Sequence, residues 1–185
     1  MIRTFAAFVV ALVVALPLAA GAATTLDPEN TLIMQLPAGK VVIQLRPDLA
    51  PNHVKRVKTL TRQGFYDGLT FHRVIPGFMA QGGDPNGDGT GGSSLPDLKA
   101  EFSNANFGRG TIGAARGDSP DSANSQFFIC FKDCSFLNGQ YTVWGEVVQG
   151  MEFVDKLKAG NPDINDGAVT KPDKIISMKV AADIK

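Results

Sequence analysis

Apolar and polar positions along the chain form many short runs, and most of these runs predict β-strands. The runs at residues 31–36 and 40–45 are apolar and rich in β-branched residues, and the turn segment 37–39 between them predicts a β-hairpin. Residues 77–92 are crowded with glycine and predict a loop around a short extended piece. Further strands are expected at residues 70–74, 111–115, 125–131, 142–147 and 174–180.

Two other segments place apolar residues three and four positions apart, which is the spacing of a buried helix face. The first, residues 47–65, has Asn52 as its expected N-cap and Gly64 as its expected C-terminal stop. The second, residues 149–158, ends before Gly160. Many short strands with one helix early and one late predict a mainly β fold, a closed or nearly closed barrel capped by the two helices.

Length and composition indicate one globular domain. The 185 residues suffice for a single core, and 44% hydrophobic with 19% charged residues excludes a disordered chain. The 18 basic and 18 acidic side chains give a formal net charge of zero, which argues against binding nucleic acid by neutralising its phosphates. No internal repeat divides the chain, so we expect a single domain over residues 24–185.

Residues 1–23 have the pattern of a signal peptide. Arg3 supplies a positive start, residues 5–20 form an apolar run, and Ala20 and Ala22 are small residues at the positions that a signal peptidase reads. The alternative is a membrane anchor, because a run of about 20 apolar residues approaches spanning length. The small-residue exit favours cleavage, so we expect export to a bacterial periplasm and no stable membrane span afterwards.

The state of the two cysteines, Cys130 and Cys134, is open at this point. In an oxidising compartment they could form a disulfide, provided that the chain turns sharply enough to bring their Cα atoms within about 7 Å. Two partly buried free thiols are the alternative. Two cysteines and two histidines are too few for a four-thiolate zinc site or for His-rich metal chemistry, so no metal or cofactor is expected.

Two further motifs indicate function only weakly. Residues 84–89 match the opening of a calcium-binding loop, but the closing glutamate would fall at Leu95, so a glycine-rich turn is the better interpretation. His72, together with Ser122 and Ser125, allows a hydrolase as an alternative function. The G-x-S-x-G motif of many hydrolases is absent from the sequence.

The most informative stretch is FHRVIPGFMAQGG at residues 71–83. It brings together the permanent cation Arg73, the amide of Gln81 and a pair of apolar side chains, and residues 125–129 (SQFFI) again place an amide beside aromatic rings. A guanidinium and two amides beside apolar rings could bind a neutral polar group that is flanked by an apolar ring. The alternative is that these rings belong to the core and that Arg73 lies at its rim.

The same residues resemble the cyclophilin family of peptidyl-prolyl cis-trans isomerases, in a bacterial exported form. The motifs FHRVIPGFMAQGGDPNGDGTGG, SQFFIC and FLNGQYTVWGEVVQGMEFVDKL occur in the family's order and spacing, and the similarity extends over residues 31–180. The resemblance implies a closed eight-stranded antiparallel β-barrel capped by two helices. It also implies an isomerase that accelerates rotation about X-Pro bonds in proline-containing peptides and assists the folding of exported proteins.

The resemblance assigns the site residue by residue. Arg73 matches the family's catalytic arginine. The expected substrate-binding residues are Phe78, Met79, Phe128 and Leu137 in the walls of the proline pocket, Gln81 and Gln126 as polar residues, Ala115, Arg116 and Gly89 along the groove, and Phe136 and Tyr141 beside it.

Three positions depart from the common eukaryotic pattern. Phe136 stands where many eukaryotic members have tryptophan, whose indole N–H helps to hold the inhibitor cyclosporin, and Tyr141 stands where they often have histidine. Arg116 replaces a common asparagine. The first two resemble bacterial members, so we expect weak cyclosporin binding with the isomerase activity kept. A monomer is expected.

The chemistry expected of Arg73 is non-covalent. Its guanidinium would donate a hydrogen bond to the prolyl nitrogen and so weaken the amide conjugation as the bond rotates. The alternative class is a proline-binding module or holding chaperone without catalysis. Such a binder has no need of a cation opposite the prolyl nitrogen, so Arg73 distinguishes the two classes.

Overall fold

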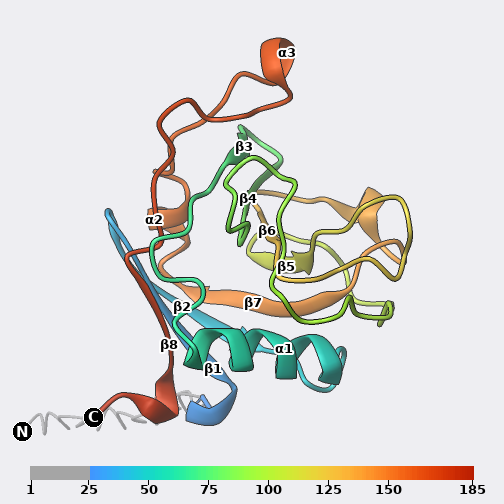
Figure 1. Ribbon diagram of the computed structural model, residues 1–185, viewed down its shortest axis with the longest axis vertical. Coiled ribbons are helices and arrows are strands. Elements are labelled where there is room, and N and C mark those ends of the chain that lie inside the picture. The colour runs from blue at the N-terminus through green and yellow to red at the C-terminus, as the bar shows by residue number, and fades with distance from the viewer. Residues whose placement is uncertain (1–25) are drawn as a thin grey trace, which may run out of the picture.

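The computed structural model describes residues 26–185, and the expected signal peptide lies outside these residues. The chain forms a mainly β domain (Figure 1). Its strands are β1 (Thr31–Leu36), β2 (Gly39–Leu45), β3 (Arg73–Ile75), β4 (Met79–Gly82), β5 (Thr111–Ala114), β6 (Phe127–Cys130), β7 (Val143–Gln149) and β8 (Ser177–Val180). Its helices are α1 (Pro51–Arg62), α2 (Met151–Val154) and α3 (Pro162–Asn165), with 3₁₀ turns η1 (Pro28–Asn30), η2 (Ser135–Leu137) and η3 (Ala181–Asp183). None of the helices within residues 26–185 has the length and hydrophobicity needed to cross a membrane.

All eight strands belong to one antiparallel sheet in the order β3-β4-β6-β5-β7-β2-β1-β8, which curves into a half-barrel. The expected eight-stranded antiparallel architecture is therefore confirmed, but the closed barrel is not. The edge strands β3 and β8 are not paired with each other in the described residues. Only the segments that precede these two strands are joined by hydrogen bonds. There, Ile175 N–H donates to Leu69 O at 2.8 Å and Phe71 N–H donates to Asp173 O at 3.0 Å.

Side chains on strands β3 to β6 alternate between two apolar clusters, since successive residues of a strand point to opposite faces. Val74, Ala80 and Ile129 belong to the larger cluster, which forms the core inside the half-barrel. Met79 and Phe128 belong to a smaller cluster on the other face of these strands. The smaller cluster also contains Phe107, Cys130, Cys134 and Val143. The sheet thus provides a second apolar surface that is separate from the main core.

The predicted hairpin is confirmed. Strands β1 and β2 pair directly up to Leu36 opposite Gly39, which leaves a two-residue turn. A Cβ atom added at Gly39 would lie 2.6 Å from the ring of Phe153 in α2. Glycine at this position therefore allows the tip of the hairpin to pack closely against α2.

Helix α1 begins at Pro51 and not at the predicted N-cap, Asn52, which lies inside the helix. Proline is favoured at the first helical position because it lacks an N–H group and its φ angle suits a helix. The N-cap residue is Ala50, whose side chain cannot accept a hydrogen bond. The carboxylate of Glu101 caps the helix instead, accepting hydrogen bonds from the N–H groups of Asn52 and His53, each at 3.0 Å.

The second predicted helix, residues 149–158, is wrong in its extent. Strand β7 continues to Gln149, Gly150 adopts φ 87° at the junction, and α2 covers only Met151–Val154. The chain then tightens, because Leu157 N–H donates to Val154 O three residues back, at 3.1 Å. Of the three apolar residues on the predicted face, Val154 and Leu157 are buried and Met151 is partly buried.

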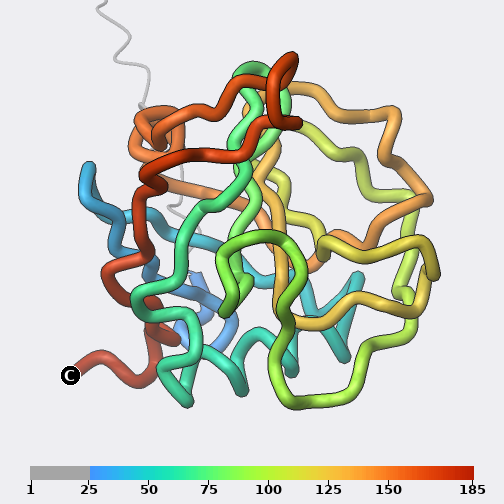
Figure 2. Tube along the Cα trace, turned by 45° about the horizontal axis from the view of Figure 1, so that its top comes forward, coloured from blue at the N-terminus to red at the C-terminus, as the bar shows by residue number. Residues whose placement is uncertain are grey.

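Two short elements complete the comparison with the expected pattern. The extended piece expected within residues 77–92 is β4. Helix α3 was not expected; it lies in the segment that passes beside β3 (Figures 1 and 2). Two backbone hydrogen bonds join this segment to β3: Val74 N–H donates to Gly167 O and Gly160 N–H donates to Val74 O, both at 2.9 Å.

Candidate functional site

Arg73, Gln81 and Phe128 lie directly opposite one another on β3, β4 and β6. Directly opposite residues of antiparallel strands project to the same face, so one row across the sheet carries a guanidinium, an amide and an aromatic ring. The row continues to Gly113 on β5, opposite Phe128. A Cβ atom at Gly113 would meet the Phe128 ring and would lie 2.7 Å from Phe107 Cε1. Glycine there lets both rings pass over the strand.

A cavity of about 150 Å³, which we call the apolar cavity, opens beside this row. It is lined by Arg73, Phe78, Met79, Gln81, Ala115, Arg116, Phe128, Leu137 and Tyr141. Each lining residue is among the site residues predicted from the sequence. The structure therefore brings together, from strands and loops far apart in the chain, most of the residues that the resemblance assigned.

Aromatic contacts fix the shape of the apolar cavity. Phe128 stacks on Phe107 with ring centroids 5.6 Å apart and planes 23° apart, and Tyr141 meets Phe128 edge-on at 5.5 Å. Phe136 does not line the cavity. It is 62% exposed, and the centroid of its ring lies 5.4 Å from the ring centroid of Phe78. Phe136 is thus a neighbour of the cavity wall.

Arg73 lies at the rim of the apolar cavity with its side chain 28% exposed. Its Nε–H donates to Asp166 O at 2.8 Å, its Nη2 donates to Asp166 Oδ1 at 3.0 Å, and its Nη1 donates to Gln81 Oε1 at 3.3 Å. A guanidinium has five N–H groups. Within residues 26–185 these bonds leave two of them without a protein acceptor, so the group is held in place yet can still donate.

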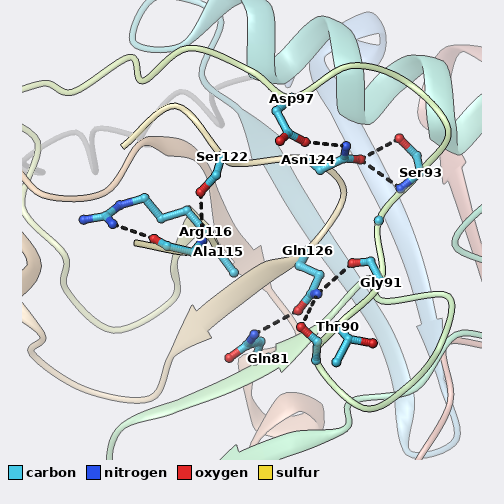
Figure 3. A pocket seen from close by; sticks show the side chains of 13 residues that line it. Gln81, Thr90, Gly91, Ser93, Asp97, Ala115, Arg116, Ser122, Asn124 and Gln126 are labelled. Carbon is cyan, nitrogen blue, oxygen red and sulfur yellow. Dashed lines mark hydrogen bonds between the residues drawn. The ribbon is translucent and has the colours of Figure 1, made fainter. Parts of the chain in front are cut away.

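Gln81 links Arg73 to a loop on the other side of the site. Its Nε2 donates to Gln126 Oε1 at 3.0 Å, and Gln126 Nε2 in turn donates to Gly89 O at 3.0 Å and to Gly91 O at 2.8 Å (Figure 3). Because Gln81 Oε1 accepts from Arg73, each amide has a fixed orientation. The chain of hydrogen bonds ties the guanidinium to the glycine-rich loop.

A second cavity, of about 500 Å³ and polar in its lining, adjoins the first and shares Gln81, Ala115 and Arg116 with it. Gly89 and Gln126, the predicted site residues absent from the apolar cavity apart from Phe136, line this polar cavity. It also contains residues that sequence reasoning did not assign to a substrate site: Thr90, Gly91, Gly92, Ser93, Asp97, Gly117, Ser122 and Asn124. They belong to loops, and the sequence carries no periodic signal that would have identified them.

The side chain of Arg116 connects two loops. In Figure 3 its guanidinium points away from the Gln81–Gln126 pair. It donates to Gly117 O at 2.8 Å and to Gln140 O at 3.2 Å, and it lies 4.7 Å from the centroid of the Tyr141 ring. Arg116 therefore supports the wall of the apolar cavity with its side chain.

The hydrolase alternative is contradicted by the geometry. His72 is buried, and within the described residues neither of its ring nitrogens has a hydrogen-bond partner. Burial lowers the pKa of His72. Ser122 Oγ donates to Ser119 O at 2.7 Å and Ser125 Oγ donates to Gly83 O at 2.8 Å, so neither serine is paired with the histidine.

The calcium-like motif is a turn. The buried carboxylate of Asp84 accepts hydrogen bonds from the backbone N–H groups of Asn86 at 2.9 Å and of Asp88 at 3.0 Å, and also from that of Gly89. A carboxylate used in this way stabilises the glycine-rich loop. In the part of the chain that the structure describes, no group of three or more His, Cys, Asp or Glu side chains could hold a metal ion.

Cys130 and Cys134 are free thiols, and both are fully buried. Cys130 lies opposite Met79 in the sheet, and Cys134 Sγ donates to Phe78 O at 3.6 Å. Burial raises the pKa of both thiols. They pack behind the apolar cavity as small apolar side chains.

A half-barrel with an apolar cavity and a fixed guanidinium at its rim has the geometry of a site for an apolar ring next to a polar acceptor. Residues 31–180 match the family model described as cyclophilin type peptidyl-prolyl cis-trans isomerase/CLD. A Brucella suis protein named "Probable peptidyl-prolyl cis-trans isomerase" is 57% identical over 174 residues, covering 88% of each chain. Peptidyl-prolyl cis-trans isomerase B of Bacillus subtilis is 42% identical over 123 residues, which cover 66% of this chain and 85% of that protein.

Solved structures agree with this match. The crystal structure of cyclophilin AquaCyp293 from Hirschia baltica has a TM-score of 0.76 at 26% identity, covering 86% of this chain and 77% of that one. A cyclophilin-type isomerase of Cryptosporidium parvum, crystallised in the presence of the dipeptide Ala-Pro, has a TM-score of 0.74 at 27% identity, covering 81% and 98%. The chain belongs to the cyclophilin-type peptidyl-prolyl cis-trans isomerases, a family of isomerase enzymes.

Proposed function

We propose that this isomerase works by placing the guanidinium of Arg73 against the nitrogen of an X-Pro bond whose proline ring occupies the apolar cavity. The observation that carries the proposal is the position of Arg73, which lies at the rim of that cavity with two N–H groups unused by the described residues. The same side chain is fixed from two directions by Asp166 and Gln81. It is therefore preorganised to donate.

Rotation about an X-Pro bond is slow because resonance gives the C–N bond partial double-bond character, with a barrier of about 18–20 kcal/mol. In the twisted amide the nitrogen becomes pyramidal and regains a lone pair. A hydrogen bond from Arg73 to that lone pair stabilises the twisted state more than the planar one. Interactions that are stronger in the transition state are the ones that accelerate a reaction.

The apolar cavity supplies the anchor against which the bond rotates. A dry cavity of about 150 Å³ can hold a benzene molecule, so the volume of about 150 Å³ here suits the smaller ring of proline. Phe128, Met79 and Leu137 give apolar contact on its walls. With the ring held, the carbonyl side of the bond is the part that turns.

The required free energy is within reach of these groups. An acceleration of about 10⁵-fold corresponds to about 7 kcal/mol of preferential transition-state stabilisation. Removal of one preorganised donor commonly costs about 2.7–4 kcal/mol, and orientation of the bound group contributes a comparable part. No metal, nucleotide or titrating base is needed in this scheme.

The flanking chain of the substrate would lie along the loops beside the apolar cavity. Gln126, Ala115 and Gly89 line the adjoining polar cavity and could bind its backbone. The side chain of Phe136 has no N–H group, unlike the tryptophan indole that helps to hold the inhibitor cyclosporin, so we propose weak cyclosporin binding. We also propose that the protein acts as a monomer.

We propose that the natural substrates are unfolded exported proteins in a bacterial periplasm. The support is the pattern of residues 1–23, with a positive start, an apolar run and a small-residue exit. Fractionation of the producing cell, followed by N-terminal sequencing, tests this directly. Protein in the periplasmic fraction that begins near residue 24 is expected, and full-length protein in the membrane fraction would contradict the proposal.

An assay with a small amount of protein and an excess of peptide distinguishes catalysis from simple binding. Cis-to-trans relaxation of a short proline peptide is measured with the protein far below the peptide concentration. A catalyst accelerates relaxation of the whole peptide population in proportion to its concentration. A holding chaperone binds a small fraction and leaves the bulk rate unchanged, which would contradict the proposed function.

A further inference from the structure

The loop that carries α3 reaches the rim of the apolar cavity through Asp166. Two atoms of this residue accept hydrogen bonds from the guanidinium of Arg73: the backbone oxygen from Nε–H at 2.8 Å, and Oδ1 from Nη2 at 3.0 Å. These contacts join residues 93 positions apart in the chain. The same side of the guanidinium is therefore held both by main chain and by side chain.

Asp166 has an unusual backbone conformation. With φ 52°, it is the one non-glycine residue within residues 26–185 that has a positive φ. Aspartate and asparagine tolerate this left-handed region better than most residues, but it still costs free energy. The backbone keeps this conformation while its carbonyl oxygen and Oδ1 both accept hydrogen bonds from one guanidinium. This combination indicates that the contact serves the function of Arg73.

The loop is fixed against the strand that carries Arg73. The residues before and after Arg73 are both hydrogen-bonded to this loop: Val74 N–H donates to Gly167 O, and Val169 N–H donates to His72 O, both at 2.9 Å. A Cβ atom at Gly167 would collide with the side chain of Ile75, so glycine permits this close approach. The loop and β3 therefore hold a defined register, and Asp166 is not a freely moving surface residue.

Stability does not explain the pair. The side chain of Asp166 is 80% exposed and that of Arg73 is 28% exposed. Ion pairs open to water in this way contribute little to the free energy of folding. The contact instead fixes the orientation of a long side chain that would otherwise sample many rotamers.

We propose that Asp166 is a positioning residue for Arg73. Its two oxygens hold Nε and Nη2 on the outer side, so that the unused N–H groups face the apolar cavity and the prolyl nitrogen bound there. This inference rests on the proposed role of Arg73. A misplacement of about 1 Å in a catalytic group can cost about 100-fold in rate, so loss of the carboxylate should be visible in turnover.

Two substitutions separate the side chain from the backbone. Asp166→Gly removes the carboxylate but keeps the left-handed conformation, and with it the backbone acceptor. Asp166→Asn keeps an oxygen acceptor and tolerates the same conformation, while it removes the charge. Asp163→Asn is the matched control, since Asp163 is an exposed acid in the same loop and lies outside the contact with Arg73.

The expected result is a fall of about tenfold in kcat for Asp166→Gly, with KM for a proline peptide changed less than about twofold. Asp166→Asn should recover activity to within about threefold of wild type, because its amide oxygen still accepts from Nη2. Wild-type melting temperatures for all three variants exclude a folding defect. If Asp166→Gly has the kcat of wild type, or if KM accounts for its loss, the positioning role is overturned.

A double-mutant cycle makes the test specific. In an Arg73→Ala background, Asp166→Gly should have no further effect, because the side chain it positions is gone. An additional tenfold loss in that background would overturn the inference while leaving the proposed function intact. If Arg73→Ala alone has wild-type turnover, the proposed function fails, and the two failures are thus distinguishable.

Discussion

Glu101 Oε2 lies 2.6 Å from Nδ1 of His53, although 48 positions separate the two residues. The same carboxylate accepts hydrogen bonds from the backbone N–H groups of Asn52 and His53 at the start of α1. One side chain from a distant loop thus caps α1 and fixes a buried histidine. It thereby joins the loop that carries Glu101 to the start of α1.

Glu101→Ala should lower the free energy of unfolding by about 1–3 kcal/mol, because it leaves the first N–H groups of α1, including that of the buried His53, without an acceptor. Glu152→Ala, which removes an exposed acid from α2, is the control and should change stability little. Urea unfolding of both variants measures the difference. Equal stability of the two variants would show that the Glu101 cap contributes nothing.

Stability should also fall in mild acid. Burial lowers the pKa of His53 and outweighs the opposing influence of Glu101. For Glu101, burial raises the pKa, but the hydrogen bonds from His53 and Asn52 together lower it below its usual value. The unfolded state therefore binds more protons than the folded state as the pH falls, so acid favours unfolding.

The pH windows follow from these directions. The contribution of His53 is complete above its unperturbed pKa of 6.5 and is lost progressively below it. The contribution of Glu101 is lost below its unperturbed value of 4.5. Urea unfolding at about pH 7 and about pH 5 should give a lower free energy of unfolding at the acid value. Equal values at the two pH values would contradict the assignment.

Local patterns in the sequence were sufficient for most of the sheet. The β1–β2 hairpin, the tight turn between its strands and the buried face of α1 all follow from residues close together in the chain. The extent of α2 was wrong because Gly150 and the tight turns after Val154 interrupt a correct apolar spacing. The helix cap was missed because Glu101 reaches Asn52 through the tertiary fold.

In the candidate site, too, local motifs were predictive and contacts between distant residues were not. Arg73, Gln81 and Phe128 were identified from motifs, and the sheet register then places them in one row. The contact of Asp166 with Arg73 could not be predicted, because the Asp-Gly pair at this position indicates only a turn. Non-local hydrogen bonds leave no periodic signal in a single sequence.

Isomerisation should depend little on pH between about pH 6 and pH 8, because the proposed mechanism uses no titrating acid or base. His72, next to Arg73 in the chain, has its pKa lowered by burial, which moves its titration toward acid pH. The rate constant for a proline peptide that lacks titrating groups is measured across the range. A bell-shaped profile would point to a titrating acid or base and would contradict a mechanism based on Arg73.

Gly113→Ala should displace the aromatic rings that form the wall of the apolar cavity. The added Cβ atom would collide with the Phe128 ring and lie 2.7 Å from Phe107 Cε1, so the cavity wall must move. We expect KM to rise several-fold and the free energy of unfolding to fall by about 1–3 kcal/mol. Gly108→Ala is the control, since its nearest neighbour is the Asn106 side chain at 3.7 Å. Unchanged KM in Gly113→Ala would remove Phe128 from the binding surface.

The central claim is that Arg73 stabilises the twisted amide, and turnover of Arg73→Ala tests it most directly. Cis-to-trans relaxation of a proline peptide is compared for wild type, Arg73→Ala and Arg73→Lys, with peptide affinity and melting temperature measured on the same samples. We predict a loss of at least about 100-fold in turnover for Arg73→Ala, with affinity changed only a few-fold. Arg73→Lys should recover little, because an ammonium group cannot bond Asp166 and Gln81 in the same planar arrangement. Wild-type turnover in a folded Arg73→Ala variant would contradict the account.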